Sequence, residues 1–234
     1  MSALIIDIET IGENFDKLDE TTKKSLTRSV ERTAKSGDEK EHLLEEVRNG
    51  LALSPLTGQI VALGVYDSSK QQGAVYYQAP NEEHEETEDQ GCKLKAMSEP
   101  EMLEKFWELV KKYDTFVTYN GRGFDIPYLL LRSAVHKIRP TRDLMSNRYV
   151  SMQRDGKHID LMDQLSFYGA VWKKPSLHMY CQALGIKSPK GDVCGGDVGK
   201  LFKEKKYLEI AKYNIGDLVA TNELYECWRK YLRF

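Results

Sequence analysis

The sequence predicts an α/β protein whose mixed sheet is flanked by helices, with a helical insertion after the first strand. Apolar residues at 4–8 are typical of a buried strand, and 58–67 and 73–79 have the composition of two more strands. Apolar residues at helical spacing begin after residue 98. Because strands and helices follow one another along the chain, we expect one domain over 1–234.

The composition is that of an ordinary globular protein. Of the 234 residues, 41% are hydrophobic, and 34 Lys and Arg against 36 Asp and Glu give a net charge of −2, which neither indicates nor excludes a nucleic-acid partner. No apolar run approaches the roughly 18–20 residues that span a bilayer, and the N-terminus has no signal-like pattern. The four cysteines lack metal-ligand spacing, so we expect reduced thiols and a cytoplasmic location.

Two polar segments interrupt the strand pattern. The stretch 13–50 predicts two exposed helices, in which Ser-Gly-Asp at 36–38 ends the first helix and caps the second. The tract 81–90 contains six acidic residues and no Lys or Arg. We therefore expect 81–97 to form an acidic surface loop.

The second half of the chain contains further helices and strands. One helix begins at Ser98, where Glu101 completes a capping box and Pro100 is tolerated in the first turn. The later elements are predicted in this order: a strand at 115–120, a helix at 125–136, a segment at 158–165 that fits strand or helix, and a long helix at 206–231.

Two acidic residues stand within the first apolar strand. Asp7 and Glu9 are two positions apart, so their side chains point to the same face of that strand. Two like charges beside apolar residues are unfavourable unless a partner neutralises them. A divalent cation is the natural partner, because hard cations prefer oxygen ligands. The pattern predicts metal ligands here.

Further candidates stand on later elements. Asn120 ends a predicted strand, and Asp125 begins the helix that follows a glycine-containing turn. Tyr213 and Asp217 are four residues apart, so they share one face of the last helix. These positions supply the additional carboxylates that a metal site on the first strand needs.

Three short patterns resemble the three exonuclease motifs of the DEDD superfamily, whose members have a ribonuclease H-like fold. They are Asp7-Ile8-Glu9, Asn120 followed by Phe124-Asp125, and Tyr213-x-x-x-Asp217. Asp-x-Glu alone occurs by chance in many proteins, but the whole set in this order is specific. The tyrosine resembles that of the DEDDy branch, since the histidine branch has His where this chain has Lys212.

The likeness extends beyond the acids to a narrower group. The segments NGRGFDIPYLLLR, HIDLMD and GIKSPKGD resemble stand-alone predicted 3′→5′ exonucleases that are related to the exonuclease domain of family-B DNA polymerases. The resemblance covers most of the chain except about 13–50 and 81–97.

The resemblance implies hydrolysis of phosphodiester bonds at nucleic-acid 3′ ends, with single-stranded DNA as the expected substrate and two Mg²⁺ or Mn²⁺ ions as cofactors. It implies that Asp7 bridges the ions, that Glu9 and Asp217 complete one site and that Asp125 completes the other. Two ions about 3.5–4 Å apart activate water and stabilise the leaving oxygen. Tyr213, with an ordinary pKa of about 10, is a poor base at neutral pH and is expected to orient the water.

Four further residues are candidate contacts to nucleic acid, and each has a structural alternative. Asn120 positions the terminal nucleotide or ties the turn, and Arg122 reaches a phosphate or lies in solvent. Phe124 stacks on a base or packs in the core, and Lys190 contacts the strand or is a surface charge. Gly216 either permits a close approach of the last helix to the first strand or is a chance surface glycine.

Other functions stay open at this point. They are an RNA 3′-end-trimming exoribonuclease, a catalytically silent nucleic-acid-binding member of the same fold, and an unrelated enzyme on an α/β scaffold. The last lacks support from a P-loop or G-x-S-x-G motif. Asp160 and Asp163 are not assigned to the site, because the motif positions are already filled. The expected partners are nucleic acid with a free 3′ end and a replication or repair protein, and no membrane.

Overall fold

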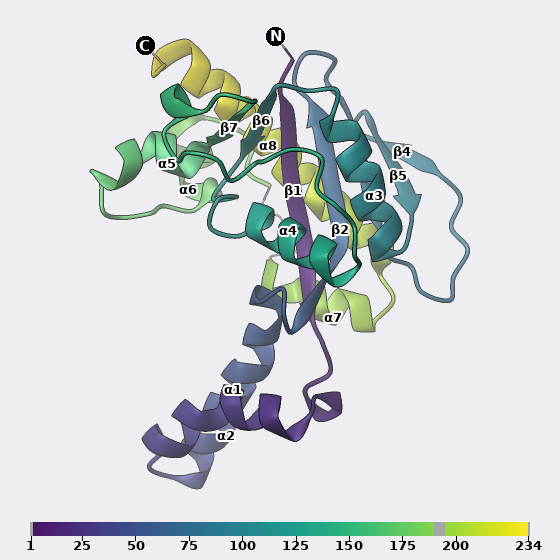
Figure 1. The fold of residues 1–234 in the computed structure, drawn as a ribbon, viewed down its shortest axis with the longest axis vertical. Helices are drawn as coiled ribbons and strands as arrows, with labels where there is room; N and C mark the ends of the chain where they lie inside the picture. The colour runs from purple at the N-terminus through teal and green to yellow at the C-terminus, as the bar shows by residue number, and fades with distance from the viewer. Residues whose placement is uncertain (1, 190–194, 234) are drawn as a thin grey trace.

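The computed structural model describes residues 2–189 and 195–233. Its strands are β1 (Leu4–Gly12), β2 (Gly58–Asp67), β3 (Gln72–Tyr77), β4 (Thr87–Asp89), β5 (Cys92–Ala96), β6 (Thr115–Thr118) and β7 (Lys157–Asp160). In the described part of the chain these strands form one sheet in the order β4-β5-β3-β2-β1-β6-β7 (Figure 1). β1 is antiparallel to β2 and parallel to β6, so the sheet is mixed and the predicted fold class is confirmed.

Helices cover both faces of this sheet (Figure 1). They are α1 (Glu20–Thr33), α2 (Gly37–Gly50), α3 (Glu99–Val110), α4 (Asp125–Val135), α5 (Leu161–Leu165), α6 (Leu177–Leu184), α7 (Val198–Lys203) and α8 (Tyr207–Tyr231). Short 3₁₀ turns are η1 (Phe15–Lys17), η2 (Leu51–Leu53), η3 (Val150–Met152), η4 (Phe167–Gly169) and η5 (Gly195–Asp197). None of the described helices, α8 included, combines the length and apolar character needed to cross a bilayer.

The alternation of side chains along β1 divides the core into two layers. Ile5 packs with the buried residues of α8 on one face, while Ile6 packs with those of α3 and α4 on the other. Asp7 and Glu9 are two and four positions after Ile5, so their side chains point to the same face of the sheet as Ile5, toward α8. The α1–α2 pair extends away from the sheet beyond the end of β1 (Figure 1).

β6 ends before it reaches the acidic part of β1. Leu4 pairs with Phe116 and Ile5 with Val117, and β6 then ends at Thr118. Asp7 and Glu9 therefore lie beyond this parallel pairing and have Gly64 and Ala62 of β2 as their cross-strand neighbours. Beyond the end of β6, the edge of β1 that faces away from β2 is not paired with β6. Side chains of the segment that follows β6 can therefore contact its backbone.

α8 lies close against the sheet at Gly64 of β2. A Cβ atom there would lie 1.9 Å from Asn214 Oδ1 and 2.6 Å from Leu218 Cδ1, so a larger residue would displace the helix. A Cβ at Gly216 would lie 3.5 Å from Pro189 Cβ, which is ordinary van der Waals contact. The close-approach interpretation of Gly216 is therefore wrong, because the glycine that permits the approach belongs to β2.

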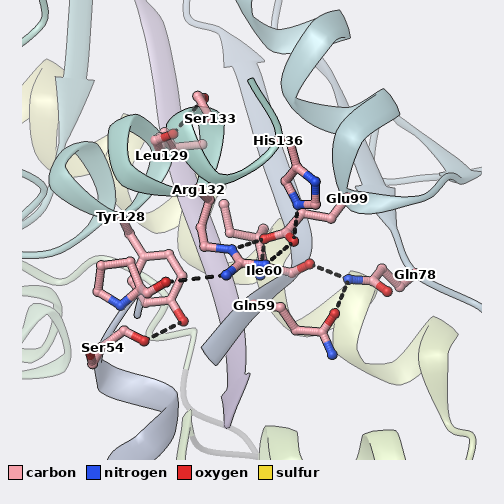
Figure 2. Close-up of polar contacts among 11 residues, drawn as sticks. Ser54, Gln59, Ile60, Gln78, Glu99, Tyr128, Leu129, Arg132, Ser133 and His136 are labelled. Carbon is pink, nitrogen blue, oxygen red and sulfur yellow. Dashed lines mark hydrogen bonds and ion pairs between the residues drawn. The ribbon is translucent and has the colours of Figure 1, made fainter. Parts of the chain in front are cut away.

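A buried ionic cluster joins α3, α4 and β2 (Figure 2). Arg132 Nε and Nη2 donate to the two oxygens of Glu99 at 2.9 and 2.7 Å, and the N–H of Ile60 donates to Glu99 Oε1 at 2.8 Å. His136 Nε2 lies 2.7 Å from Glu99 Oε2. Burial by itself raises the pKa of Glu99, but the hydrogen bonds from Arg132, Ile60 and His136 together bring it below its ordinary value.

Most of the predicted elements are confirmed. α1 and α2 occupy the insertion, and the side chain of Ser36 accepts a hydrogen bond at the start of α2. Ser98 and Glu101 form the predicted capping box of α3. The ambiguous segment 158–165 contains both alternatives, since β7 ends at Asp160 and α5 follows it. The last helix begins and ends within one residue of the prediction.

The prediction that the whole of 81–97 is a surface loop is wrong, although 81–86 is irregular. This segment contains β4 and β5, and β5 pairs with β3 inside the sheet. Cys92 and Leu94 are buried while Lys93 and Lys95 are exposed, which is the alternation of a half-buried strand. The dense acidic residues that precede this short alternation conceal it in the sequence.

Candidate active site

Three carboxylates from two elements converge on the α8 face of the sheet. Asp7 and Glu9 come from β1 and Asp217 comes from α8, and one oxygen of each lies within 4.8 Å of the others. Small residues in β2 stand opposite the two strand acids, and they leave room for α8 to bring Asp217 close. Two of the predicted motifs, which are more than 200 residues apart in sequence, therefore meet.

Asp125 reaches the same strand from the first turn of α4. Its Oδ1 accepts a 3.1 Å hydrogen bond from the N–H of Ile8, the residue between Asp7 and Glu9. The side chain thus occupies the position that a carbonyl of β6 would take if β6 continued. Asp125 is not part of the group of three converging oxygens, but its charge contributes to raising the pKa of Asp7.

Burial and mutual repulsion disfavour the charged forms of these acids. Burial, followed by the charge of Asp217, raises the pKa of Asp7 and of Glu9 well above the ordinary values. Burial also raises the pKa of Asp125 to about 7. A divalent cation relieves this repulsion, and carboxylate oxygens are the ligands that Mg²⁺ and Mn²⁺ prefer. The donor set therefore fits a divalent metal ion.

Asn214 is a site residue that sequence reasoning missed. Its side chain is fully buried, and Nδ2 donates a 2.7 Å hydrogen bond to Asp7 Oδ2. It also hydrogen-bonds Glu9 and thereby lowers the pKa of that residue, against the larger effect of burial. The available signal was an asparagine on the buried face of a long helix, where this residue type is unfavourable unless it has a partner.

Tyr213 lies one turn before Asp217 on α8. Its hydroxyl hydrogen-bonds the Asp217 carboxylate. Burial, and then the charges of Asp217, Glu9 and Asp7, raise the pKa of this phenol above its ordinary value. Tyr213 is therefore a neutral hydrogen-bonding group at physiological pH.

The two acids left out of the site bind other groups of the protein. Asp160 accepts hydrogen bonds from the backbone N–H groups of Asn120 and Arg122, both at 2.9 Å. Asp163 forms an ion pair with Arg148. Asn120 has a φ of 61°, a left-handed conformation that asparagine tolerates better than most residues. The backbone of Asn120 thus helps to tie the turn, and its contact with a terminal nucleotide stays a prediction.

The guanidinium group of Arg122 is held by main-chain carbonyl groups, and its contact with a phosphate stays a prediction. Its Nη2 donates to the carbonyl oxygens of Met145 and Ser146, at 3.2 and 2.6 Å. The guanidinium group therefore joins the turn before α4 to the segment that precedes η3. The sequence could not anticipate this, because the contact crosses more than 20 residues.

Phe124 and Lys190 are the other two candidate contacts to nucleic acid. Phe124 is half-buried and packs with the α3 and α4 core, with its ring centroid 5.4 Å from that of Tyr128. This agrees with the core interpretation of Phe124. Lys190 lies outside the described residues.

A solved structure that resembles this fold is the family B DNA polymerase from the hyperthermophilic archaeon Pyrobaculum calidifontis. The match has a TM-score of 0.58 at 18% identity, and it covers 97% of this chain and 24% of the polymerase. At this identity the likeness shows the fold. The protein has the ribonuclease H-like fold of a family B polymerase exonuclease domain.

The sequence match defines the family within this class. Residues 73–233 match the family described as predicted 3′-5′ exonuclease related to the exonuclease domain of PolB. The match covers well over half of the chain, and the chain belongs to this family. It includes Asn120, Asp125, Tyr213 and Asp217, while Asp7 and Glu9 precede it.

The curated relatives are much longer proteins. The chain is 27% identical over 137 residues to a DNA polymerase of Pyrococcus glycovorans and 29% identical over 140 residues to one of Pyrococcus horikoshii. A third match, to a DNA polymerase of Methanocaldococcus jannaschii, is 44% identical over 41 residues. The matches cover 54%, 54% and 18% of this chain, and 18%, 11% and 2% of the polymerases. The chain thus spans less than a fifth of the length of these relatives.

Proposed function

We propose that this protein removes nucleotides from the 3′ end of single-stranded DNA by metal-dependent hydrolysis. The proposal rests on the convergence of Asp7, Glu9 and Asp217 within 4.8 Å, with Asp125 hydrogen-bonded to the same strand. Clustered carboxylates of raised pKa are what a cation-dependent phosphodiesterase needs, and they are costly to a protein that has no use for them. Membership of a family of predicted 3′-5′ exonucleases supports the direction of attack.

The carboxylates divide naturally between two metal positions. Asp7, Glu9 and Asp217 would hold one Mg²⁺ or Mn²⁺ ion, and Asp125 together with Asp7 would hold a second. When bound, such ions promote ionisation of the attacking water and stabilise the charge on the leaving 3′ oxygen.

The remaining polar groups position these ligands. Asn214 fixes the orientation of Asp7 through its 2.7 Å hydrogen bond, and Ile8 fixes Asp125 through its backbone N–H. The hydroxyl of Tyr213 orients the attacking water by hydrogen bonding and does not remove its proton, because the raised pKa keeps the phenol protonated.

DNA is the proposed substrate because the polymerase relatives carry the name DNA polymerase. A replication or repair protein is the partner that we expect to deliver the 3′ end. The alternative substrate is RNA, and the test includes both nucleic acids.

The test is a time course on 5′-labelled single-stranded DNA and RNA with Mg²⁺, Mn²⁺ or EDTA. We expect a ladder of products that shortens from the 3′ end, faster on DNA, and no reaction in EDTA. The control is Asp217→Ala, which removes one ligand. Internal cleavage, release from the 5′ end, or full activity after removal of metal would contradict the proposal.

A further inference from the structure

An exposed aromatic loop projects from the region between α5 and α6. Trp172 is 85% exposed and Phe167 58% exposed, although both are residue types that proteins usually bury or half-bury. Val171 between them is also exposed. We call residues 167–174 the aromatic loop. Neighbouring apolar side chains on the surface commonly mark a place where another molecule binds.

The backbone of the aromatic loop is held in an unfavourable conformation. Phe167, Tyr168 and Gly169 all have positive φ, at 51°, 57° and 96°, and only glycine adopts such values without strain. The turn is fixed by hydrogen bonds from the N–H groups of Gly169 and Val171 to the carbonyl of Ser166. The conformation therefore holds Phe167 in a position where more than half of its surface stays in contact with water.

Tyr168 anchors the loop from its other side. Its hydroxyl accepts a 2.8 Å hydrogen bond from Gln164 and a longer one from the N–H of Val150, and its ring lies 4.7 Å from that of Tyr149. Tyr168 thus ties the aromatic loop to the rest of the protein, while Phe167 and Trp172 are exposed to solvent.

The loop is joined directly to the segment that carries the candidate site. Tyr119, which precedes Asn120, donates its hydroxyl hydrogen bond to the carbonyl of Pro175, the residue that directly follows the aromatic loop. The ring of Tyr119 also packs edge-on against Tyr180 of α6. The same Tyr119-to-Asp125 turn therefore positions both Asp125 and the aromatic loop.

The charge of this region suits a polyanion. Residues 164–191 contain no Asp or Glu, although the whole chain has 36 of them. Lys173 and Lys174 directly follow Trp172, both are exposed, and neither forms an ion pair with any residue in 2–189 or 195–233. Aromatic rings beside unpaired lysines are the combination by which proteins hold single-stranded nucleic acid, through base stacking and phosphate contacts.

We propose that the aromatic loop binds the single-stranded part of the nucleic acid upstream of the 3′ terminus, with bases stacked on Trp172 and Phe167 and phosphates at Lys173 and Lys174. This inference rests on the proposed function, because it names the surface that leads the strand to the carboxylates. It predicts a preference for single strands, since paired bases cannot stack on the two rings.

The test measures binding in EDTA, so that it does not depend on hydrolysis. Anisotropy of a 5′-fluorescein-labelled 12-nucleotide oligothymidylate gives the dissociation constant for wild type, Trp172→Ala and Trp172→Phe. Loss of one stacked base weakens binding about tenfold or more, so we expect that loss for Trp172→Ala and much less for Trp172→Phe. Tyr231→Ala is the matched control, since Tyr231 is 66% exposed at the far end of α8 and should leave binding unchanged.

The contribution of Lys173 and Lys174 is measured separately, through the salt dependence of binding. The logarithm of the association constant for single strands falls with log salt by about 0.7 for each phosphate contacted, so Lys173→Ala combined with Lys174→Ala should reduce this slope by about 1.4. The adjacent exposed pair Lys111 and Lys112 at the end of α3, changed in the same way, should leave the slope unaltered. A 12-base-pair blunt duplex should bind more weakly than the single strand.

The outcomes separate this inference from the proposed function. Wild-type affinity in Trp172→Ala, or an unchanged salt slope in the double lysine variant, overturns the inference and assigns the loop to another use such as a protein contact. Absence of hydrolysis by wild type in Mg²⁺ or Mn²⁺ overturns the proposed function but leaves the binding measurements intact. Loss of affinity in Trp172→Ala with retention in Trp172→Phe and Tyr231→Ala supports the inference.

Discussion

Asn214 on α8 donates a 2.7 Å hydrogen bond to Asp7 on β1, across 207 positions of sequence. The glycine at position 64 makes this possible, because a Cβ there would lie 1.9 Å from the oxygen of the same amide. The contact fixes one carboxylate of the candidate site from the helix that supplies another. A helix that carries one ligand thus also orients the ligand of the neighbouring strand.

Asn214→Ala should reduce activity while the carboxylates remain. Groups that orient metal ligands typically contribute about 10–100-fold to metal affinity or activity, and we expect a loss in that range. Because Asp7 then lacks its fixed orientation, more Mg²⁺ or Mn²⁺ should be needed for half-maximal rate. Titration of the metal in the exonuclease assay measures this. Asn222→Ala, at a buried asparagine further along α8, is the control, and an equal effect there would indicate a general loss of packing.

Asp217→Ala should abolish hydrolysis without destabilising the metal-free protein. Removal of one acid from a group of like charges relieves repulsion, so the thermal midpoint in EDTA should stay the same or rise. Addition of Mg²⁺ or Mn²⁺ should raise the midpoint of the wild type, because a ligand that binds the folded state stabilises it, and should raise that of the variant less. A marked fall of the midpoint in EDTA would instead favour a structural role for Asp217.

Tyr213→Phe should lower kcat with little change in KM. The ring packing and all four carboxylates remain, and only the hydroxyl that hydrogen-bonds Asp217 is lost. Positioned proton-transfer or orienting groups contribute about 10²–10⁴-fold, and an interaction made in the transition state appears in kcat. Single-turnover measurements, in which chemistry limits the rate, are the appropriate assay. Near-normal turnover would reduce Tyr213 to a packing residue.

The Glu99–Arg132 pair should make stability depend on pH. The pKa of Glu99 is lower in the folded protein than in the unfolded chain, so the carboxylate stabilises the fold above its unfolded pKa of about 4.3 and loses this contribution as the pH falls further. Breaking a buried ion pair by removing one partner costs about 3–5 kcal/mol, and Glu99→Gln should approach this at pH 7. Urea unfolding at pH 7 and pH 4 should show a smaller difference between variant and wild type at pH 4. An equal difference at both pH values would show that the charge is not what matters.

The α1–α2 insertion should contribute to substrate binding more than to the chemical step. It follows directly from the strand that carries Asp7 and Glu9, so it lies next to the candidate site in sequence. Its ends are adjacent, since a Cβ at Gly12 would lie 2.6 Å from Leu51 Cβ, so a short Gly-Ser linker can replace 15–48. We expect a change in the affinity for single-stranded DNA or in the preferred strand length, with little change in the rate of the chemical step. Unchanged affinity and length preference in a folded deletion protein would assign the insertion another use.

The sequence by itself determined what depends on local spacing. The apolar alternation of β1, the capping box at Ser98 and the helical spacing of Tyr213 and Asp217 each follow from residues within a few positions of one another, and each predicted element formed. The fold class and the identity of the candidate carboxylates, though not their meeting in one group, could be predicted for this reason. The short strand β5 was not, because its alternation spans only five residues beside a strongly acidic tract.

Only the tertiary structure decided which side chains meet. The hydrogen bond from Asn214 to Asp7, the contact of Asp125 with the backbone of Ile8, and the turning of Arg122 towards Met145 and Ser146 all join segments that lie far apart along the chain. Such contacts depend on where β6 ends and on how closely α8 approaches Gly64. No local pattern encodes these distances, because they result from the packing of all the elements around one sheet.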